Sequence, residues 1–121
     1  MSGAGGISLH AVDVSTGRPA EGLSVRLLRI NDSGCELIAA GICGKSGAFD
    51  HPSVRGEGIS AGIYAAEFDV SQYYTAQGTD LANPAFLGIV RFQFGVADPS
   101  QHFHLPFKFT AWGYSLFRGG L

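Results

Sequence analysis

The stretch His102-Phe-His-Leu-Pro-Phe-Lys-Phe-Thr-Ala111 decides the fold, because its apolar residues occupy every second position. In a strand, alternate side chains point to opposite faces and rise about 7 Å for each step of two residues. The apolar face, which predicts a surface turned toward a core, carries Phe103, Leu105, Phe107 and Phe109. The opposite face carries His102, His104, Lys108 and Thr110. Two imidazoles and an ammonium on an outer face predict proton chemistry near neutral pH.

Size and charge restrict the class of protein. A chain of 121 residues fits one domain, expected over residues 7–121 after a flexible segment over residues 1–6. Charged residues make up 15% of the chain, the net charge is -2 and the 8 basic residues are scattered, so neither nucleic acid nor a membrane is an expected partner. No apolar run reaches the roughly 18 residues of a membrane span, and the first residues lack signal-peptide features. We therefore expect a cytoplasmic protein.

Short segments with alternating or β-branched character recur along the chain, and each ends in Gly, Pro, Asp or Asn. This spacing predicts an all-β fold in which two sheets pack as a sandwich. The expected strands are 7–14, 23–30, 36–43, 62–68, 88–96, 103–111 and a short last strand near residue 114. The core face of the strand over 88–96 is expected to carry Val90, Phe92, Phe94 and Val96.

One short helix is expected after the strand over 62–68. Asp69 or Ser71 is its predicted N-cap, Tyr73 and Tyr74 are predicted to pack inward, and Gly78 marks its C-terminus. The cysteines, Cys35 and Cys43, match no metal or redox spacing and are interpreted as reduced packing residues.

Three histidines lie on non-core faces of the expected strands. His10 shares a mixed face with Ser8, and His102 and His104 share the outer face described above. Two imidazoles two residues apart on a strand, with a third from elsewhere, suit a zinc site that keeps an open position for water. The other reading is hydrolysis without a metal, in which an imidazole takes a proton from water and a cation holds negative charge. The residues alone leave both chemistries open.

Four blocks of sequence carry a resemblance to a known family. They are Leu9-His-Ala-Val-Asp-Val-Ser-Thr-Gly-Arg-Pro-Ala20, residues 86–98, His102-Phe-His-Leu-Pro106 and Gly113-Tyr-Ser-Leu-Phe-Arg-Gly-Gly120. In this order and spacing they resemble the transthyretin-like 5-hydroxyisourate hydrolases, over about residues 7 to 120. The resemblance implies a Greek-key, prealbumin-like sandwich that forms a homotetramer, with sites in clefts between dimers. It also implies no metal and no organic cofactor.

The resemblance implies an activity and a set of site residues. The activity is hydrolysis of 5-hydroxyisourate in urate breakdown, in which a histidine activates water to attack a ring carbonyl. The matching catalytic residues are His10, His104 and Arg118. The residues expected to bind substrate are His102, Lys108, Ser115, Phe117 and Ala48.

The chain departs from the family pattern at the site. Ser46-Gly-Ala48 stands where the family has Asp-Gly-Arg, Phe117 replaces a Tyr and Gly120 replaces a Ser. The cation that the family arginine would supply is therefore missing. We hypothesise that Lys108, or else Lys45 or Arg55, supplies a cation in its place. An ammonium cannot form the two-pronged contact of Arg. The alternatives are a hydrolase acting on a related heterocycle and a small-molecule-binding protein of the same fold without catalysis.

Overall fold

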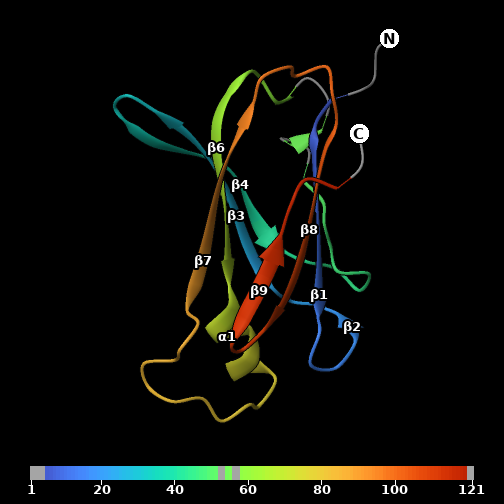
Figure 1. Cartoon of the computed structure of the whole chain (residues 1–121), viewed down its shortest axis with the longest axis vertical. Coiled ribbons are helices and arrows are strands. Elements are labelled where there is room, and N and C mark those ends of the chain that lie inside the picture. Colours follow the sequence, from blue (N-terminus) through green and yellow to red (C-terminus); the bar gives the residue numbers. More distant parts are fainter. Residues whose placement is uncertain (1–4, 52–53, 56–57, 120–121) are drawn as a thin grey trace.

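The computed structural model describes residues 5–51, 54–55 and 58–119 and shows two sheets packed face to face (Figure 1). The first sheet has the order β2-β1-β8-β9, with β5 also paired to β1, and the second has the order β4-β3-β6-β7. The elements are β1 (Ile7–Asp13), β2 (Arg18–Pro19), β3 (Ser24–Asn31), β4 (Gly34–Ile42), β5 (Ala48–Phe49), β6 (Gly62–Asp69), α1 (Val70–Ala76), β7 (Ile89–Val96), β8 (Phe103–Thr110) and β9 (Gly113–Leu116). The expected all-β sandwich with one short helix is confirmed.

The core lies between the sheets and is centred on β8. Its four alternating apolar side chains are buried, as predicted: Phe103, Leu105, Phe107 and Phe109. Phe107 stacks on Phe68 of β6 with 4.0 Å between ring centroids, which joins the two sheets. Burying a Phe side chain stabilises a fold by roughly 1.5 to 3 kcal/mol. Since these rings fix β8 against the second sheet, the polar residues of β8 must face outward.

Of the side chains predicted to form the core face of β7, only some are buried as expected. Val90 and Val96 are buried, but Phe92 and Phe94 are only half-buried and pack against the margin of the core. The reason is that β7 is the last strand of its sheet, so its side chains have a neighbour on one side only.

Helix α1 begins and ends as expected. The carboxylate of Asp69 accepts a hydrogen bond from the Gln72 N–H at 3.2 Å, which makes Asp69 the N-cap. Tyr73 and Tyr74 are buried, and Gly78 follows with a φ of +85°. Within the residues described, no helix has the length and apolarity to cross a membrane.

Two short strands escaped prediction. β2 and β5 are two residues each, too short for any periodicity to show. β2 pairs with the C-terminal end of β1, and β5 pairs with its middle. Gly47, just before β5, has a φ of +84°, and a Cβ there would overlap the carbonyl oxygen of Ala11. Only glycine fits this close approach, and it brings the chain beside β1.

Order extends further toward the N-terminus than expected. Residues 1–4 of the predicted flexible segment lie outside the described residues, whereas Gly5 and Gly6 are buried. The carbonyl of Gly6 accepts a hydrogen bond from the Phe103 N–H at 3.0 Å, and Gly6 also bridges to Arg55. Among the described residues, the segment beside β8 therefore begins at Gly5.

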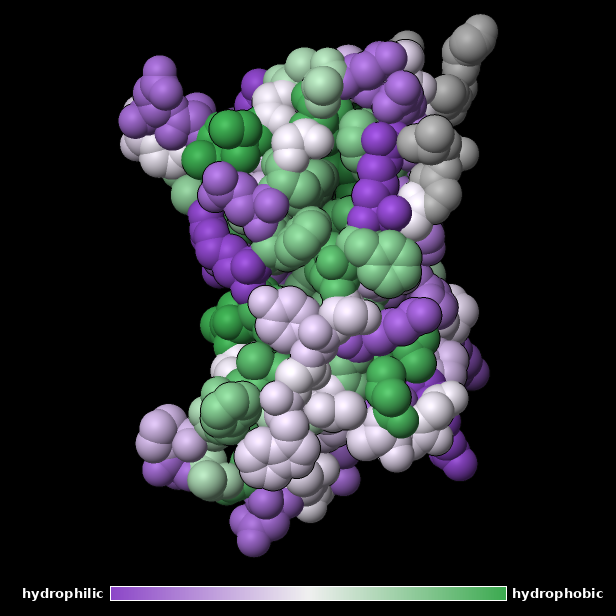
Figure 2. Space-filling view, viewed as in Figure 1, coloured by the Kyte–Doolittle hydropathy of each residue, from purple (hydrophilic) through white to green (hydrophobic). Residues whose placement is uncertain are grey.

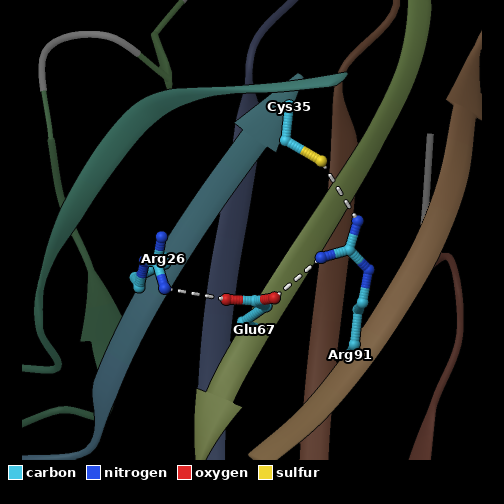
Figure 3. Close-up of polar contacts among 4 residues, drawn as sticks. All are labelled: Arg26, Cys35, Glu67 and Arg91. Carbon is cyan, nitrogen blue, oxygen red and sulfur yellow. Dashed lines mark hydrogen bonds and ion pairs between the residues drawn. The ribbon is translucent and has the colours of Figure 1, made fainter. Parts of the chain in front are cut away.

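The outer face of the second sheet carries a small polar cluster (Figure 3). Glu67 forms ion pairs with Arg26 at 3.3 Å and with Arg91 at 2.8 Å, and Arg91 donates to Cys35 Sγ at 3.5 Å. Cys35 is exposed, so its interpretation as a packing residue is wrong, whereas Cys43 is buried and that interpretation is confirmed. Burial raises the pKa of the Cys43 thiol to about 12. Exposed ion pairs of this kind contribute at most about 1 kcal/mol.

Candidate active site

The outer face of the first sheet gathers most of the predicted site residues. β1 and β8 run parallel, and Ser8 is the partner of His104 while Val12 is the partner of Lys108. On the flanking strands, Ala48 pairs with His10 and Ser115 pairs with Lys108. Paired residues share a face of a sheet, and alternate residues of one strand do so as well. His10 and His104 thus lie on one face of one chain, although 94 residues separate them in the sequence.

Two imidazoles meet at the Ser8 hydroxyl. Ser8 Oγ lies 2.8 Å from Nε2 of His102 and 2.6 Å from Nδ1 of His104. The other ring nitrogen of His102, Nδ1, lies 2.8 Å from the carbonyl oxygen of Gly5 and donates to it. All four groups are partly or wholly buried. His104 therefore has one nitrogen tied to Ser8, and Nε2 is the nitrogen left for chemistry.

His10 has the opposite arrangement. Its Nε2 lies 2.6 Å from the carbonyl oxygen of Ser46, in the turn before β5, and therefore donates to it. In the neutral ring this leaves Nδ1 as the acceptor. The two histidines consequently present different nitrogens on the same face.

Burial lowers the pKa of His104 below its ordinary value of 6.5, and the charges that His10 and His102 would carry lower it further. A lowered pKa keeps the imidazole of His104 neutral at pH 7, which is the state that can accept a proton.

The C-terminal tail crosses His104. The Gly119 N–H donates to the His104 carbonyl at 2.7 Å, and a Cβ on Gly119 would lie 3.0 Å from Cδ2 of the His104 ring. Arg118 lies elsewhere: its guanidinium covers the Phe103 ring at 3.9 Å and donates to Gln101 Oε1 and to the His102 carbonyl. Within one chain, therefore, Arg118 is engaged at the end of the sandwich rather than with His104.

Comparisons with known proteins show the family. The profile described as Transthyretin: HIUase/Transthyretin family matches residues 7–119. This chain belongs to the HIUase/Transthyretin family. A 5-hydroxyisourate hydrolase 2 of Rhizobium meliloti (strain 1021) is 36% identical over 119 residues, which cover 98% of this chain and 99% of that protein. A 5-hydroxyisourate hydrolase of Ralstonia nicotianae is also 36% identical, over 95% of this chain and 98% of its own.

Solved structures show the same fold. The 5-hydroxyisourate hydrolase of Klebsiella pneumoniae superposes with a TM-score of 0.79 at 28% identity, over 99% of this chain and 100% of that chain. An (S)-allantoin synthase superposes with a TM-score of 0.88 at 25% identity over 98% of this chain, which spans 45% of that longer chain. Transthyretin from Sparus aurata, at 22% identity and a TM-score of 0.80, shares the fold.

At position 48, where the resemblance implies an arginine, this chain has Ala48. Ala48 is exposed and pairs with His10, so the β5 side chain beside His10 is a methyl group. Arg55 pairs with Asp50: Nη2 of its guanidinium lies 2.7 Å from each carboxylate oxygen, and both side chains are exposed. Lys45 lies exposed in the turn before β5. Lys108 is exposed on the site face, 6.0 Å from the centroid of the Phe117 ring, and no carboxylate pairs with it within the described residues.

A shallow hollow of about 300 Å³ borders His102, with Ser8 and Arg55 also in its lining. A wider one of about 550 Å³ lies around Asp13 and Tyr73 and contains none of the predicted site residues.

Across the part of the chain that the structure describes, no three His, Cys, Asp or Glu side chains are grouped to hold a metal ion. Gly120, the remaining departure in the tail, lies outside the described residues.

Two residues of this site were not predicted. Ser8 shares a face with His10 in the sequence pattern, but its contact with His104 depends on parallel pairing between strands at opposite ends of the chain. Gly119 gave no signal other than its small size. The close approach of the tail to His104 is what requires it.

Proposed function

We propose that this protein hydrolyses a cyclic amide or ureide and that its substrate is 5-hydroxyisourate. The observation that carries the proposal is its similarity, over nearly the full length of both chains, to proteins named 5-hydroxyisourate hydrolase. The outer face of β1 and β8 supports it, because that face presents a neutral imidazole with an available nitrogen. Such a nitrogen is what a general base requires.

In the proposed mechanism, His104 Nε2 takes a proton from a water molecule. The water oxygen forms a bond to the ring carbonyl carbon, and the carbonyl oxygen takes up negative charge. The C–N bond of the ring then breaks, and its nitrogen receives the proton from His104. The ring opens to a carboxylated ureido-imidazoline, with one water consumed. His10, whose Nε2 is held by the Ser46 carbonyl, accepts a substrate N–H at Nδ1.

Lys108 is the proposed cation for this reaction. It stands on the site face beside Ser115 and Phe117, which with His102 and Ala48 are the proposed binding residues. An ammonium can stabilise the developing negative charge without the planar geometry of the family arginine. We accordingly expect turnover to be weaker than an arginine in place of Ala48 would permit.

A homotetramer is the proposed assembly, with Arg118 reaching a site completed by a second copy. The edge strands β7 and β9 support self-association, because Ile89, Trp112 and Tyr114 are half or more exposed there. Phe86 contacts Trp112 with 6.0 Å between centroids, so both sheet edges lie on one side of the molecule. Figure 2 shows green, hydrophobic side chains on the visible face of the molecule, interspersed with hydrophilic ones. Open strand edges with exposed apolar groups favour pairing with another chain.

A cytoplasmic location remains a prediction.

A binding protein without catalysis is the second candidate. The observation that favours it is the methyl group of Ala48 beside His10, where the family places a guanidinium. In that case the outer face would hold a heterocycle without opening it.

Adding the protein to freshly generated 5-hydroxyisourate tests both candidates. The absorbance of the substrate should decay faster than it does spontaneously, in proportion to protein concentration. A protein that slows or leaves unchanged this decay, yet binds the substrate, would instead be the binding protein.

A further inference from the structure

The Ser8 hydroxyl touches two imidazoles but has only one hydrogen to donate. Its oxygen lies 2.8 Å from His102 Nε2 and 2.6 Å from His104 Nδ1, both within hydrogen-bond distance. It must therefore donate to one ring and accept from the other. Which ring it donates to decides where the hydrogen of His104 lies.

The Gly5 carbonyl sets the direction of the hydrogen bonds that run through His102 and Ser8 to His104. The carbonyl oxygen of Gly5 can only accept, so His102 carries its hydrogen on Nδ1, 2.8 Å away. When His102 is neutral, its Nε2 is then an acceptor and takes the Ser8 hydrogen. The Ser8 oxygen consequently accepts from His104 Nδ1, and His104 Nε2 is left with a lone pair.

We propose that Ser8 and His102 are positioning residues that hold His104 in the tautomer with its hydrogen on Nδ1. The inference rests on the proposed function, because it is the bare Nε2 that would take a proton from water. A histidine in the wrong tautomer cannot act as the base, and the hydrogen bond made by its other nitrogen selects the tautomer. In this role Ser8 does not need to touch the substrate, and His102 acts on His104 through the Ser8 hydroxyl.

The Gly5 carbonyl, which anchors this series of hydrogen bonds, belongs to the segment that pairs with β8. Gly5 is buried, and the next carbonyl, that of Gly6, accepts from the Phe103 N–H at 3.0 Å. Parallel pairing of β1 with β8 then places Ser8 opposite His104. The backbone therefore fixes both ends of the network, so the tautomer is built into the fold before any substrate binds.

The reverse order of donors and acceptors would place the hydrogen of His104 on the other ring nitrogen, which can be measured. If His102 were charged, its Nε2 would donate to Ser8, the Ser8 hydroxyl would donate to His104 Nδ1, and the hydrogen of His104 would lie on Nε2. Nuclear magnetic resonance of the protein with 15N-labelled histidine separates the two cases, because protonated and bare ring nitrogens have different chemical shifts. At about pH 8, where imidazoles are ordinarily neutral, we expect Nδ1 of His104 to be protonated and Nε2 bare.

Variants of Ser8 test the cause. In Ser8→Ala the His104 signals should shift toward a mixture of tautomers, and Ser8→Thr, which retains the hydroxyl, should restore the wild-type pattern. His102→Phe should behave as Ser8→Ala does. A wild-type His104 with its hydrogen on Nε2, or a tautomer that Ser8→Ala leaves unchanged in a folded protein, overturns the proposal.

Kinetics give the second readout. With 5-hydroxyisourate, Ser8→Ala should lower kcat by roughly 10- to 100-fold with little change in KM, since a misoriented base affects the chemical step. Ser8→Thr should recover most of kcat. The control is Ser33→Ala, which removes a hydroxyl that bonds only within the β3–β4 turn. An unchanged kcat in Ser8→Ala overturns the proposal, whereas an inactive wild type with the expected tautomer would reject only the proposed function.

Discussion

The chemistry of this face depends on single nitrogen atoms. His10 and His104 lie on adjacent strands, yet His10 uses Nε2 to donate to the Ser46 carbonyl while His104 uses Nδ1 to contact Ser8. The same type of side chain therefore presents a different ring nitrogen in each case, and its hydrogen-bond partner decides which one. The backbone anchors the first histidine, and a hydroxyl anchors the second.

Loss of the proposed base should nearly abolish turnover. His104→Ala is expected to lower kcat with 5-hydroxyisourate by roughly 100- to 10,000-fold, the range that a general base contributes. The matched control, His51→Ala, removes an imidazole that stacks on Phe49 and is not among the proposed site residues, so it should retain activity. Equal rates for wild type and His104→Ala would remove His104 from the mechanism.

The positive charge of Lys108 is expected to contribute to turnover. Lys108→Leu should lower kcat/KM on the order of tenfold at low ionic strength and by less in high salt, because an exposed charge is screened. Lys108→Arg should retain activity. If Lys108→Leu turns over and binds substrate as the wild type does, the lysine only lines the outer face.

The lowered pKa of His104 also predicts how stability depends on pH. Since the folded protein binds a proton at His104 less readily than the unfolded chain does, folding free energy is lost as the pH falls below 6.5. Urea unfolding between pH 8 and pH 5 should show His104→Gln losing less stability than the wild type. Parallel curves for the two proteins would contradict the prediction.

At the scale of elements, the tail after β9 holds the site against β8. Gly119 hydrogen-bonds the His104 backbone and leaves no room beside the ring, with Pro106 Cδ at 3.3 Å from the position of a Cβ. The strand and the tail together fix the ring from two sides. A side chain at position 119 must therefore move one of them.

Gly119→Ala should displace the His104 ring and lower kcat several-fold, with a loss of stability of about 1 kcal/mol from overpacking. Gly88→Ala is the matched control, because a Cβ at Gly88 meets nothing within 4 Å. Enzyme assays and thermal unfolding of both variants measure the difference. A Gly119→Ala protein as active as Gly88→Ala would show that the tail moves without affecting the ring.

At the scale of the whole molecule, the exposed apolar side chains at the β7 and β9 edges predict association. The chain should elute and scatter light as a species of four times 12.7 kDa. Trp112→Asp places a charge on a side chain that is 73% exposed in the single chain, and it should give smaller species. Leu37→Asp, on β4 at the opposite edge of the second sheet, should leave the tetramer intact. A wild-type protein that remains monomeric would reject this assembly.

The sequence by itself determined the sandwich, because its strongest signals are local. The alternation in β8 defines a core face without reference to any other residue, and Asp69 caps α1 through a bond three residues away. The long strands were accordingly located within about two residues of their bounds. β2 and β5 were missed because two residues carry no period.

Only the tertiary structure decided how the site is assembled. The sequence marked His10 and His104 separately, but their shared face follows from parallel pairing between the first and eighth strands. The same pairing put Ser8 between His102 and His104, and the tail put Gly119 against the ring while turning Arg118 onto Phe103. The physical reason is that a strand's own pattern fixes which way its side chains face, whereas the choice of neighbouring strand depends on burial summed over the whole core.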